Sequence, residues 1–91
     1  QNLSVSALAR RAQMSQRTFS RRFQEETGVS PGVWVRERRL DLARELLEAG
    51  ELSIDVIAAR SGLGSADTLR HHLRRHLGMA PSAYRKVFVG R

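Results

Sequence analysis

Apolar residues recur along this chain at intervals of three and four positions, which is the spacing of one face of an α-helix. Val5, Leu8 and Ala12 show this spacing near the start of the chain, and Leu40 and Leu47 keep it in the middle. No segment alternates apolar and polar residues for long enough to predict a β-strand. The pattern therefore predicts an all-α protein.

Serine, proline and glycine residues mark where the predicted helices begin and end. A serine hydroxyl can cap the first turn, proline is favoured at the first helical position, and glycine accepts the left-handed conformation after the last turn. These signals predict helices over residues 5–12, 16–27, 31–49, 54–60, 66–77 and 81–88. The expected N-caps are Ser4, Ser15, Ser53 and Ser65, and the expected stops are Gly28, Gly50 and Gly78.

The second half of the chain repeats the first half. Residues 3–11 align with residues 52–60, and residues 18–34 align with residues 68–84 after one extra residue near Gly64. Two copies are too few for a solenoid, so the repeat predicts two lobes. Trp34 and Tyr84 occupy equivalent positions, and we expect each to anchor the core of its lobe.

Each copy has the proportions of a helix-turn-helix unit, in which a helix of about eight residues, a turn of three or four and a longer helix follow one another. Ala9 and Ala58 are small where the second helix must cross closely, and Gly62 in the second turn accepts a positive φ. Gln13 holds that place in the first turn, which weakens the signal there. The sequence thus predicts one domain over residues 1–91, with helix-turn-helix subdomains at 3–29 and 52–78, a linker helix at 30–50 and a closing helix at 79–88.

Arginine dominates the charge of the chain. Sixteen Lys+Arg against nine Asp+Glu give a net charge of +7, and fifteen of the sixteen bases are arginine. Residues 1–24 carry +5 and residues 56–91 carry +6, whereas residues 25–55 carry −4. A basic domain rich in arginine favours an anionic partner, above all nucleic acid, and two solvated charged faces are the alternative.

A polar stripe lies opposite the apolar face of the second helix in each copy. Phe19 and Phe23 face the expected core in the first copy, and Leu69, Leu73 and Leu77 do so in the second. Arginine suits both the guanine edge and phosphate, so a stripe that occurs twice favours DNA binding over a solvated face. The stripes consist of Arg17, Ser20, Arg21 and Gln24 in the first copy and Asp67, Arg70, His71 and Arg74 in the second.

Five short motifs carry a family resemblance. They are Phe-Ser-Arg-Arg-Phe at 19–23, Thr-Gly-Val-Ser-Pro at 27–31, Arg-Leu-Asp-Leu-Ala-Arg-Glu-Leu-Leu at 39–47, Gly-Leu-Gly-Ser at 62–65 and Gly-Met-Ala-Pro-Ser-Ala-Tyr-Arg at 78–85. Together they resemble the C-terminal DNA-binding domain of AraC-type bacterial transcription regulators, and the segment 64–70 is most similar to members with an N-terminal class I glutamine amidotransferase-like domain. The chain departs from the family at Gln13 and Met14, where an aromatic residue or glycine is frequent, and at Leu73, where phenylalanine is common.

The resemblance implies that two recognition helices read adjacent major grooves of double-stranded DNA. It implies a cytoplasmic, nucleoid-associated transcription regulator that more often activates than represses, with RNA polymerase as a further partner. Effector binding and dimerisation would belong to an N-terminal part, and the start at Gln1 suggests a piece of a longer protein. The expected base-facing residues are Arg17, Ser20, Arg21, Gln24, Ala66, Asp67, Arg70 and His71, and the expected contacts to the DNA backbone come from Ser15, Gln16, Arg36, Ser65 and Arg74.

Other chemistry finds little support in the sequence. The chain has no cysteine, and the longest apolar run, residues 56–59, is far too short for a membrane span. His72 and His76 are four residues apart but have no accompanying carboxylate, and Gly62 and Gly64 follow a helix rather than the strand of a dinucleotide site. We therefore expect no metal, no cofactor, no membrane contact and no catalytic activity. A helical module for an acidic protein and an RNA-binding domain remain the alternatives.

Overall fold

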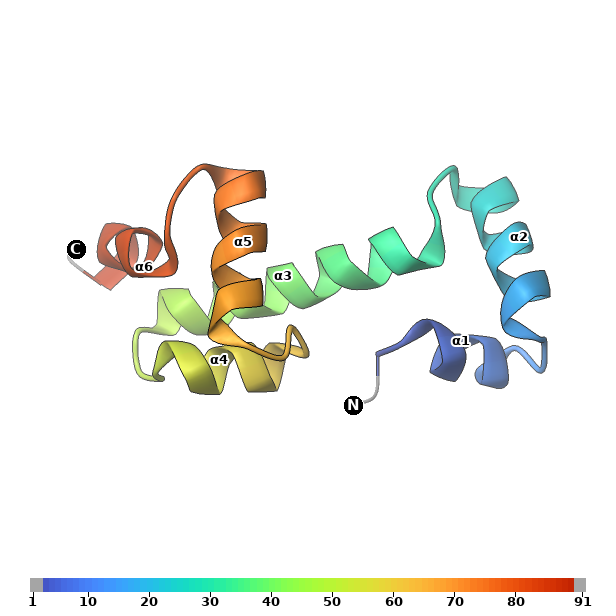
Figure 1. Cartoon of the computed structure of the whole chain (residues 1–91), viewed down its shortest axis with the longest axis horizontal. Helices are drawn as coiled ribbons and strands as arrows, with labels where there is room; N and C mark the ends of the chain where they lie inside the picture. The colour runs from blue at the N-terminus through green and yellow to red at the C-terminus, as the bar shows by residue number, and fades with distance from the viewer. Residues whose placement is uncertain (1–2, 90–91) are drawn as a thin grey trace. The chain divides into compact units, whose positions relative to one another are not determined.

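The computed structural model of the chain describes residues 3–89 and is helical in all its regular structure within that range (Figure 1). The helices are α1 (Val5–Arg11), α2 (Gln16–Thr27), α3 (Pro31–Ala49), α4 (Ile54–Ser61), α5 (Ala66–Leu77) and α6 (Pro81–Val89). The prediction of an all-α protein is confirmed, and each helix begins and ends within one residue of its predicted bounds.

Serine hydroxyls start five of the helices. The Ser4 hydroxyl accepts a hydrogen bond from the N–H of Ala7 at 3.2 Å, and this satisfies one of the donors that a first turn leaves unpaired. The hydroxyls of Ser15, Ser30, Ser53 and Ser65 accept equivalent bonds of 3.2–3.3 Å from the residue three positions on. Local sequence therefore fixes where each of these helices begins.

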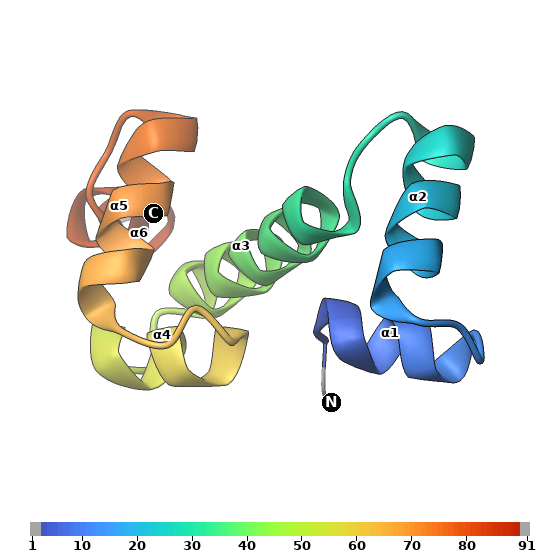
Figure 2. The same cartoon turned by 45° about the vertical axis from the view of Figure 1, so that its right-hand side comes forward.

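The chain divides into two compact units, residues 1–38 (unit 1) and residues 39–91 (unit 2), and α3 contributes to both. Within unit 1, α2 packs against α1. Within unit 2, α5 packs against both α4 and α6 (Figure 2). Each unit thus contains a packed pair of consecutive helices joined by a short turn, α1 with α2 in unit 1 and α4 with α5 in unit 2, and each pair has the order of a helix-turn-helix.

Unit 2 has a well-formed apolar core. The side chains of Leu47, Ile57, Leu69 and Leu73 are fully buried, and they join α3, α4 and α5. The predicted core face of α5 is confirmed at Leu69 and Leu73, while Leu77 packs against the core and is only partly buried. Burial of such a leucine contributes about 1.5–3 kcal/mol, so this core accounts for much of the stability of unit 2.

Unit 1 covers its apolar face less completely. Phe19 and Phe23 lie 5.6 Å apart between ring centroids, and the Phe23 ring meets Trp34 edge-on at 5.9 Å. All three side chains are only half-buried, and none of the residues of α2 is fully buried. Ala9, Pro31 and Val35 are the buried apolar residues of this unit within the described chain. The predicted apolar stripe is present, but its rings remain partly in contact with solvent.

In both units, the residue at the start of the turn adopts the left-handed backbone conformation. Gly62 adopts a φ of 86°, and Gln13 at the equivalent place adopts a φ of 57° although it carries a side chain. A left-handed conformation costs an L-residue about 1–2 kcal/mol, because Cβ crowds the backbone. The first unit therefore has the same kind of turn although its sequence signal at Gln13 is weak, and Gln13 is locally strained.

Matching hydrogen bonds close the two turns. The N–H of Met14 donates to the carbonyl of Ala9 at 3.0 Å, and the N–H of Gly64 donates to the carbonyl of Ala58 at 3.0 Å. The extra residue of the second turn, Leu63, is buried in the unit 2 core. The insertion inferred from the repeat is therefore confirmed, and it adds an apolar side chain to the core.

Replacing Gln13 with glycine should stabilise unit 1 by about 0.5–1 kcal/mol, because relief of the left-handed strain exceeds the extra entropy that glycine gives the unfolded chain. Trp34 is the only tryptophan and belongs to unit 1, so urea unfolding followed by its fluorescence reports the change. The opposite change is Gly62→Ala. Its Cβ would lie 3.1 Å from the Nε of Arg39, so this variant should destabilise unit 2, and circular dichroism instead of Trp34 fluorescence follows that unfolding. A lower midpoint for Gln13→Gly would contradict the strain argument.

A buried tyrosine fastens α6 to α3 within unit 2. Tyr84 is 6% exposed, and its hydroxyl donates a hydrogen bond to the carboxylate of Glu48. The Nε of Arg44 donates to the same hydroxyl at 3.3 Å, and its guanidinium lies 5.8 Å from the centre of the Tyr84 ring. The expected role of Tyr84 as a core anchor is confirmed, and its polar end is satisfied by charged partners from α3.

The single tyrosine should ionise later than an ordinary tyrosine. Burial, with the hydrogen bond to Glu48, raises the pKa of Tyr84 above its usual value near 10. Because the folded pKa is the higher one, the stability from this group is fully present below the unfolded pKa and is lost as the pH rises through the folded pKa. Ultraviolet titration should show the delayed ionisation, and the Tyr84→Phe variant should lack this alkaline loss of stability. A normal titration curve would show that the hydroxyl is solvated.

Candidate nucleic-acid interface

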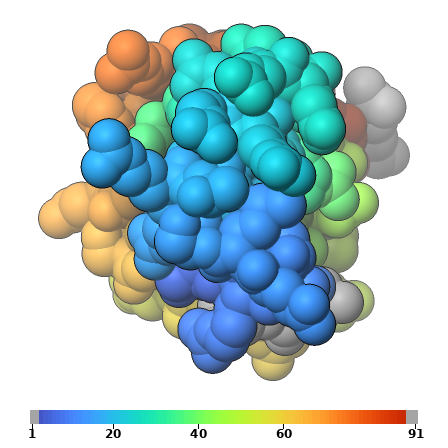
Figure 3. Space-filling view, turned by 90° about the vertical axis from the view of Figure 1, so that its right-hand side faces the viewer, coloured from blue at the N-terminus to red at the C-terminus, as the bar shows by residue number. Residues whose placement is uncertain are grey.

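The first polar stripe lies on the exposed side of α2. Its predicted members Arg17, Arg21 and Gln24 are exposed, while Ser20 is half-buried. Phe19 and Phe23 turn the opposite side of the helix toward the apolar face of unit 1, so local periodicity sets the direction of the stripe. In the space-filling view of Figure 3, the atoms of α1 and α2, coloured blue to cyan, make up the face toward the viewer.

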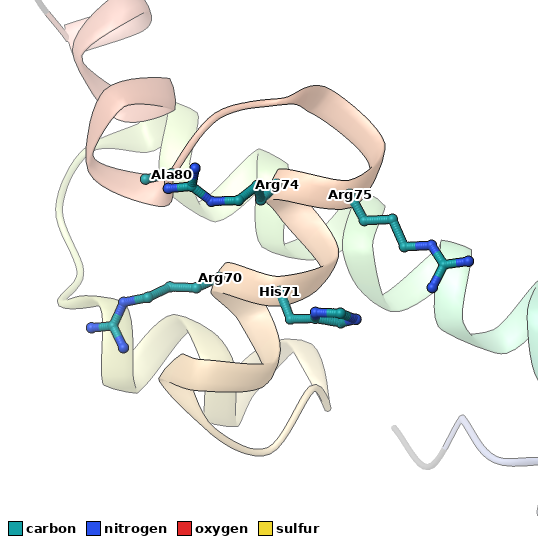
Figure 4. A pocket seen from close by; sticks show the side chains of 5 residues that line it. All are labelled: Arg70, His71, Arg74, Arg75 and Ala80. Carbon is teal, nitrogen blue, oxygen red and sulfur yellow. The ribbon is translucent and has the colours of Figure 1, made fainter.

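The second stripe lies on α5. Arg70, His71 and Arg74 are exposed, and together with Arg75 and Ala80 they line a shallow depression of about 460 Å³. In Figure 4, Arg70 and Arg74 extend to one side of α5, and His71 and Arg75 extend to the other. This surface is rich in hydrogen-bond donors and positive charge, which suits phosphate oxygens and the acceptor atoms of guanine.

Arg75 was not among the candidates predicted from the sequence. Arg75 follows His71 by four residues, and residues four apart share a helix face. That spacing alone could have placed Arg75 on the stripe. Ala66, which entered through the family resemblance, is half-buried at the first turn of α5.

An ion pair distinguishes the second stripe from the first. The Nη1 of Arg70 lies 2.8 Å from the Oδ1 of Asp67, one helical turn earlier. The equivalent position on α2 holds Arg17 instead of an acid. The repeat therefore conserves the shape of the two helices but inverts the charge at one exposed position.

The helix N-termini offer a second kind of anion contact. The hydroxyls of Ser15 and Ser65 are engaged in their caps and also bond to the hydroxyls of Thr18 and Thr68, at 3.1 Å and 3.0 Å. Both serines are exposed, so the first-turn N–H groups beside them stay close to solvent. Free N–H groups and the helix dipole make such ends favourable for phosphate. The roles predicted for Ser15, Ser65 and the following Gln16 stay predictions.

The remaining backbone candidates are Arg36 on α3 and Arg74 on α5, and both are exposed. Exposure is what a contact to phosphate requires, but it does not by itself select these arginines from the others. Their contact with DNA stays a prediction. The same holds for each of the eight base-facing candidates.

The histidines form no metal-binding group in the structure. His72 and His76 have ring centroids 6.5 Å apart, and no cluster of three histidine or acidic residues that could hold a metal occurs within residues 3–89. None of the helices in this range is long and apolar enough to cross a membrane. The surface chemistry of the described residues is thus dominated by the arginine stripes.

Known proteins match the chain along nearly its whole length. A family described as a helix-turn-helix domain matches residues 8–87. The HTH-type transcriptional regulator Rv1931c of Mycobacterium tuberculosis is 43% identical over 85 residues, which cover 93% of this chain and 33% of that protein. The virulence regulon transcriptional activator VirF of Yersinia enterocolitica is 36% identical over 85 residues, which cover 93% of this chain and 31% of that protein.

A solved structure is similar over the entire chain. The DNA-binding domain of AdpA, a global transcriptional factor crystallised in complex with a target DNA, has a TM-score of 0.87 and 44% identity, covering 100% of this chain and 82% of that one. This chain spans about a third of the length of Rv1931c and VirF. Both the sequence and the fold therefore place the chain in the AraC family, as a helix-turn-helix DNA-binding domain of transcription regulators.

Proposed function

We propose that this domain binds double-stranded DNA in a sequence-specific manner, with α2 and α5 acting as recognition helices in two adjacent major grooves. The observation that carries the proposal is the duplicated exposed stripe, which occurs on the second helix of each helix-turn-helix unit. Similarity to a domain crystallised with its target DNA supports the same conclusion. A recognition helix needs an exposed polar face at this position, because that face meets the base edges.

The residues of each stripe have distinct tasks in this proposal. Arg17 and Arg21 donate from α2 to guanine O6 and N7, and Ser20 and Gln24 complete that face. The N-terminal turns of α2 and α5, with Arg36 and Arg74, hold phosphates and fix the register of the domain on the duplex. Arginine is suited to both tasks because its planar fork presents several donors at once.

The larger protein is proposed to be a transcription regulator that acts at the nucleoid. Activation is favoured over repression, since VirF is named a transcriptional activator. Contacts with RNA polymerase, and effector binding and dimerisation through an N-terminal part, complete this proposal. The domain itself is proposed to be a binding module without catalytic activity, because the exposed arginine stripes suit the binding of anionic groups.

Two other functions make different predictions about binding. A module for an acidic protein would bind long duplex DNA with no sequence preference, as any polycation does. An RNA-binding domain would prefer duplex RNA to duplex DNA, although the deep and narrow major groove of RNA does not admit a helix. Selection of sites from a random duplex library, followed by competition with duplex RNA, separates these functions from the proposed one.

Substitution of Arg17 or Arg21 with alanine should weaken binding to the selected site about 5- to 150-fold and relax the preference at one or two base pairs, because a bidentate guanine contact is worth about 1–3 kcal/mol. The matched control is Arg22→Ala. Arg22 is exposed on the same helix but lies about 100° around it from Arg21, so it should change binding to all sequences alike. Equal losses on selected and scrambled DNA for Arg17→Ala and Arg21→Ala would argue against base reading by α2.

The spacing of the two half-sites should be fixed. Because α3 is continuous over 19 residues, about 28 Å of helix, we propose that it acts as a rigid spacer. An insertion of five base pairs turns the second half-site by about half a helical turn, and ten base pairs add about 34 Å. Footprinting on a spacing series should therefore show loss of protection at one half-site for both insertions. Full protection after the ten-base-pair insertion would reveal a flexible connection.

A further inference from the structure

We propose that Asp67 and Arg70 act as one coupled reader that selects a G·C base pair, with Asp67 as a specificity-determining residue. This inference rests on the proposed function, because it assigns α5 a place in the major groove. Its basis is the contact between the two side chains and the presence of an acid on a stripe that is otherwise basic.

The ion pair is too exposed to be explained by folding stability. The side chains of Arg70 and Asp67 are 56% and 95% exposed, and their atoms are 2.8 Å apart. An exposed pair of this kind contributes little to folding, because both charges are well solvated when separated. Asp67 is also the only acidic residue among residues 56–91. Neither packing nor the stability of the ion pair therefore explains why an isolated acid lies at the start of the proposed recognition helix.

A carboxylate at this position opposes general DNA binding. It stands at the first turn of α5, where a helix N-terminus otherwise attracts phosphate, and it reduces the positive charge of the stripe. The equivalent residue of α2 is Arg17, which has the opposite effect. A carboxylate facing the major groove becomes favourable only beside a hydrogen-bond donor, which is the amino group of cytosine or adenine.

The pair presents a combination of groups that matches one kind of base pair. The bond to Asp67 uses one N–H group of the Arg70 Nη1, so the other N–H groups of the guanidinium can still donate, and Oδ2 of Asp67 can still accept. Guanine offers two neighbouring acceptors, O6 and N7, and its partner cytosine offers the N4 donor beside them. An A·T pair lacks two adjacent acceptors. The pair of side chains therefore complements G·C, and the ion pair orders Arg70 before DNA arrives.

The test compares Asp67→Asn, Arg70→Ala and the double variant on three duplexes: the selected site, the same site with the read G·C pair changed to A·T, and random DNA. For Asp67→Asn the preference for G·C over A·T should fall about tenfold, as loss of a base contact does. Binding to random DNA should become about two- to threefold tighter, because a repulsive charge is gone. The double variant should lose no more preference than Arg70→Ala alone, since the two residues act together.

Asp55→Asn is the matched control. Asp55 is an exposed acid in the first turn of α4, so this variant makes the same charge change at the same place in a helix that is not proposed to read bases. It should leave the G·C preference unchanged. If Asp67→Asn lowers the melting temperature but keeps the G·C preference, Asp67 serves only the helix dipole and the inference is wrong. If the wild-type protein shows no preference for any duplex, the proposed function itself fails.

Discussion

Each unit depends on a small buried alanine in the first helix of its packed pair. Ala9 is 2% exposed and Ala58 is fully buried, at equivalent places in the first helix of each unit. The carbonyls of these same alanines accept the hydrogen bonds that close the two turns. A larger side chain there would push the second helix outward and at the same time disturb the turn that aims it. In each unit, one alanine is therefore constrained both by the packing of its side chain and by the hydrogen bond to its carbonyl.

The two units share this arrangement of helix and turn but differ in how completely they bury their apolar side chains. Unit 2 buries whole leucine side chains between its helices, whereas unit 1 keeps the aromatic rings of α2 half-covered. Helices that bury less apolar surface open locally at lower free energy, so α2 has less packing to hold it in place than α5 has. The arginines of α2 form no ion pair within the described part of the chain, and Arg70 on α5 does. One stripe is thus loosely supported and strongly basic, and the other is firmly supported and partly neutralised.

Most of the fold follows from short-range signals that a sequence displays directly. Ser15 and Ser65 cap their helices by accepting a hydrogen bond from the N–H group three residues later. This bond depends only on neighbouring residues, so the sequence alone predicts it. The repeat of Leu69 and Leu73 at four-residue spacing likewise identifies a buried face without reference to other helices. The exposed candidates on α2 and α5 follow from the same periodicity, since the residues opposite a buried face must meet solvent.

Features that depend on tertiary contacts, or on the conformation of a single residue, could not be predicted in this way. Gln13 adopts the left-handed conformation, which residues with a side chain rarely adopt, and the hydrogen-bonded turn around it explains this conformation. The contact of Tyr84 with Arg44 and Glu48 joins residues far apart in sequence. Asp67 and Arg70 are close in sequence, but the spacing alone does not say that their charges meet instead of pointing to solvent. Contacts between distant residues and the conformations of individual residues determine these three features.

The buried Leu63 shows that the length of the turn and the start of the following helix are independent of each other. The bonds that bracket the turn are the same in both units, although one turn is longer by a residue. The additional residue turns inward and adds apolar surface to the core, so the lengthened loop brings its own stabilisation. A duplicated unit can therefore diverge in loop length, a change that usually shifts register, while the polar face of its second helix keeps its starting point.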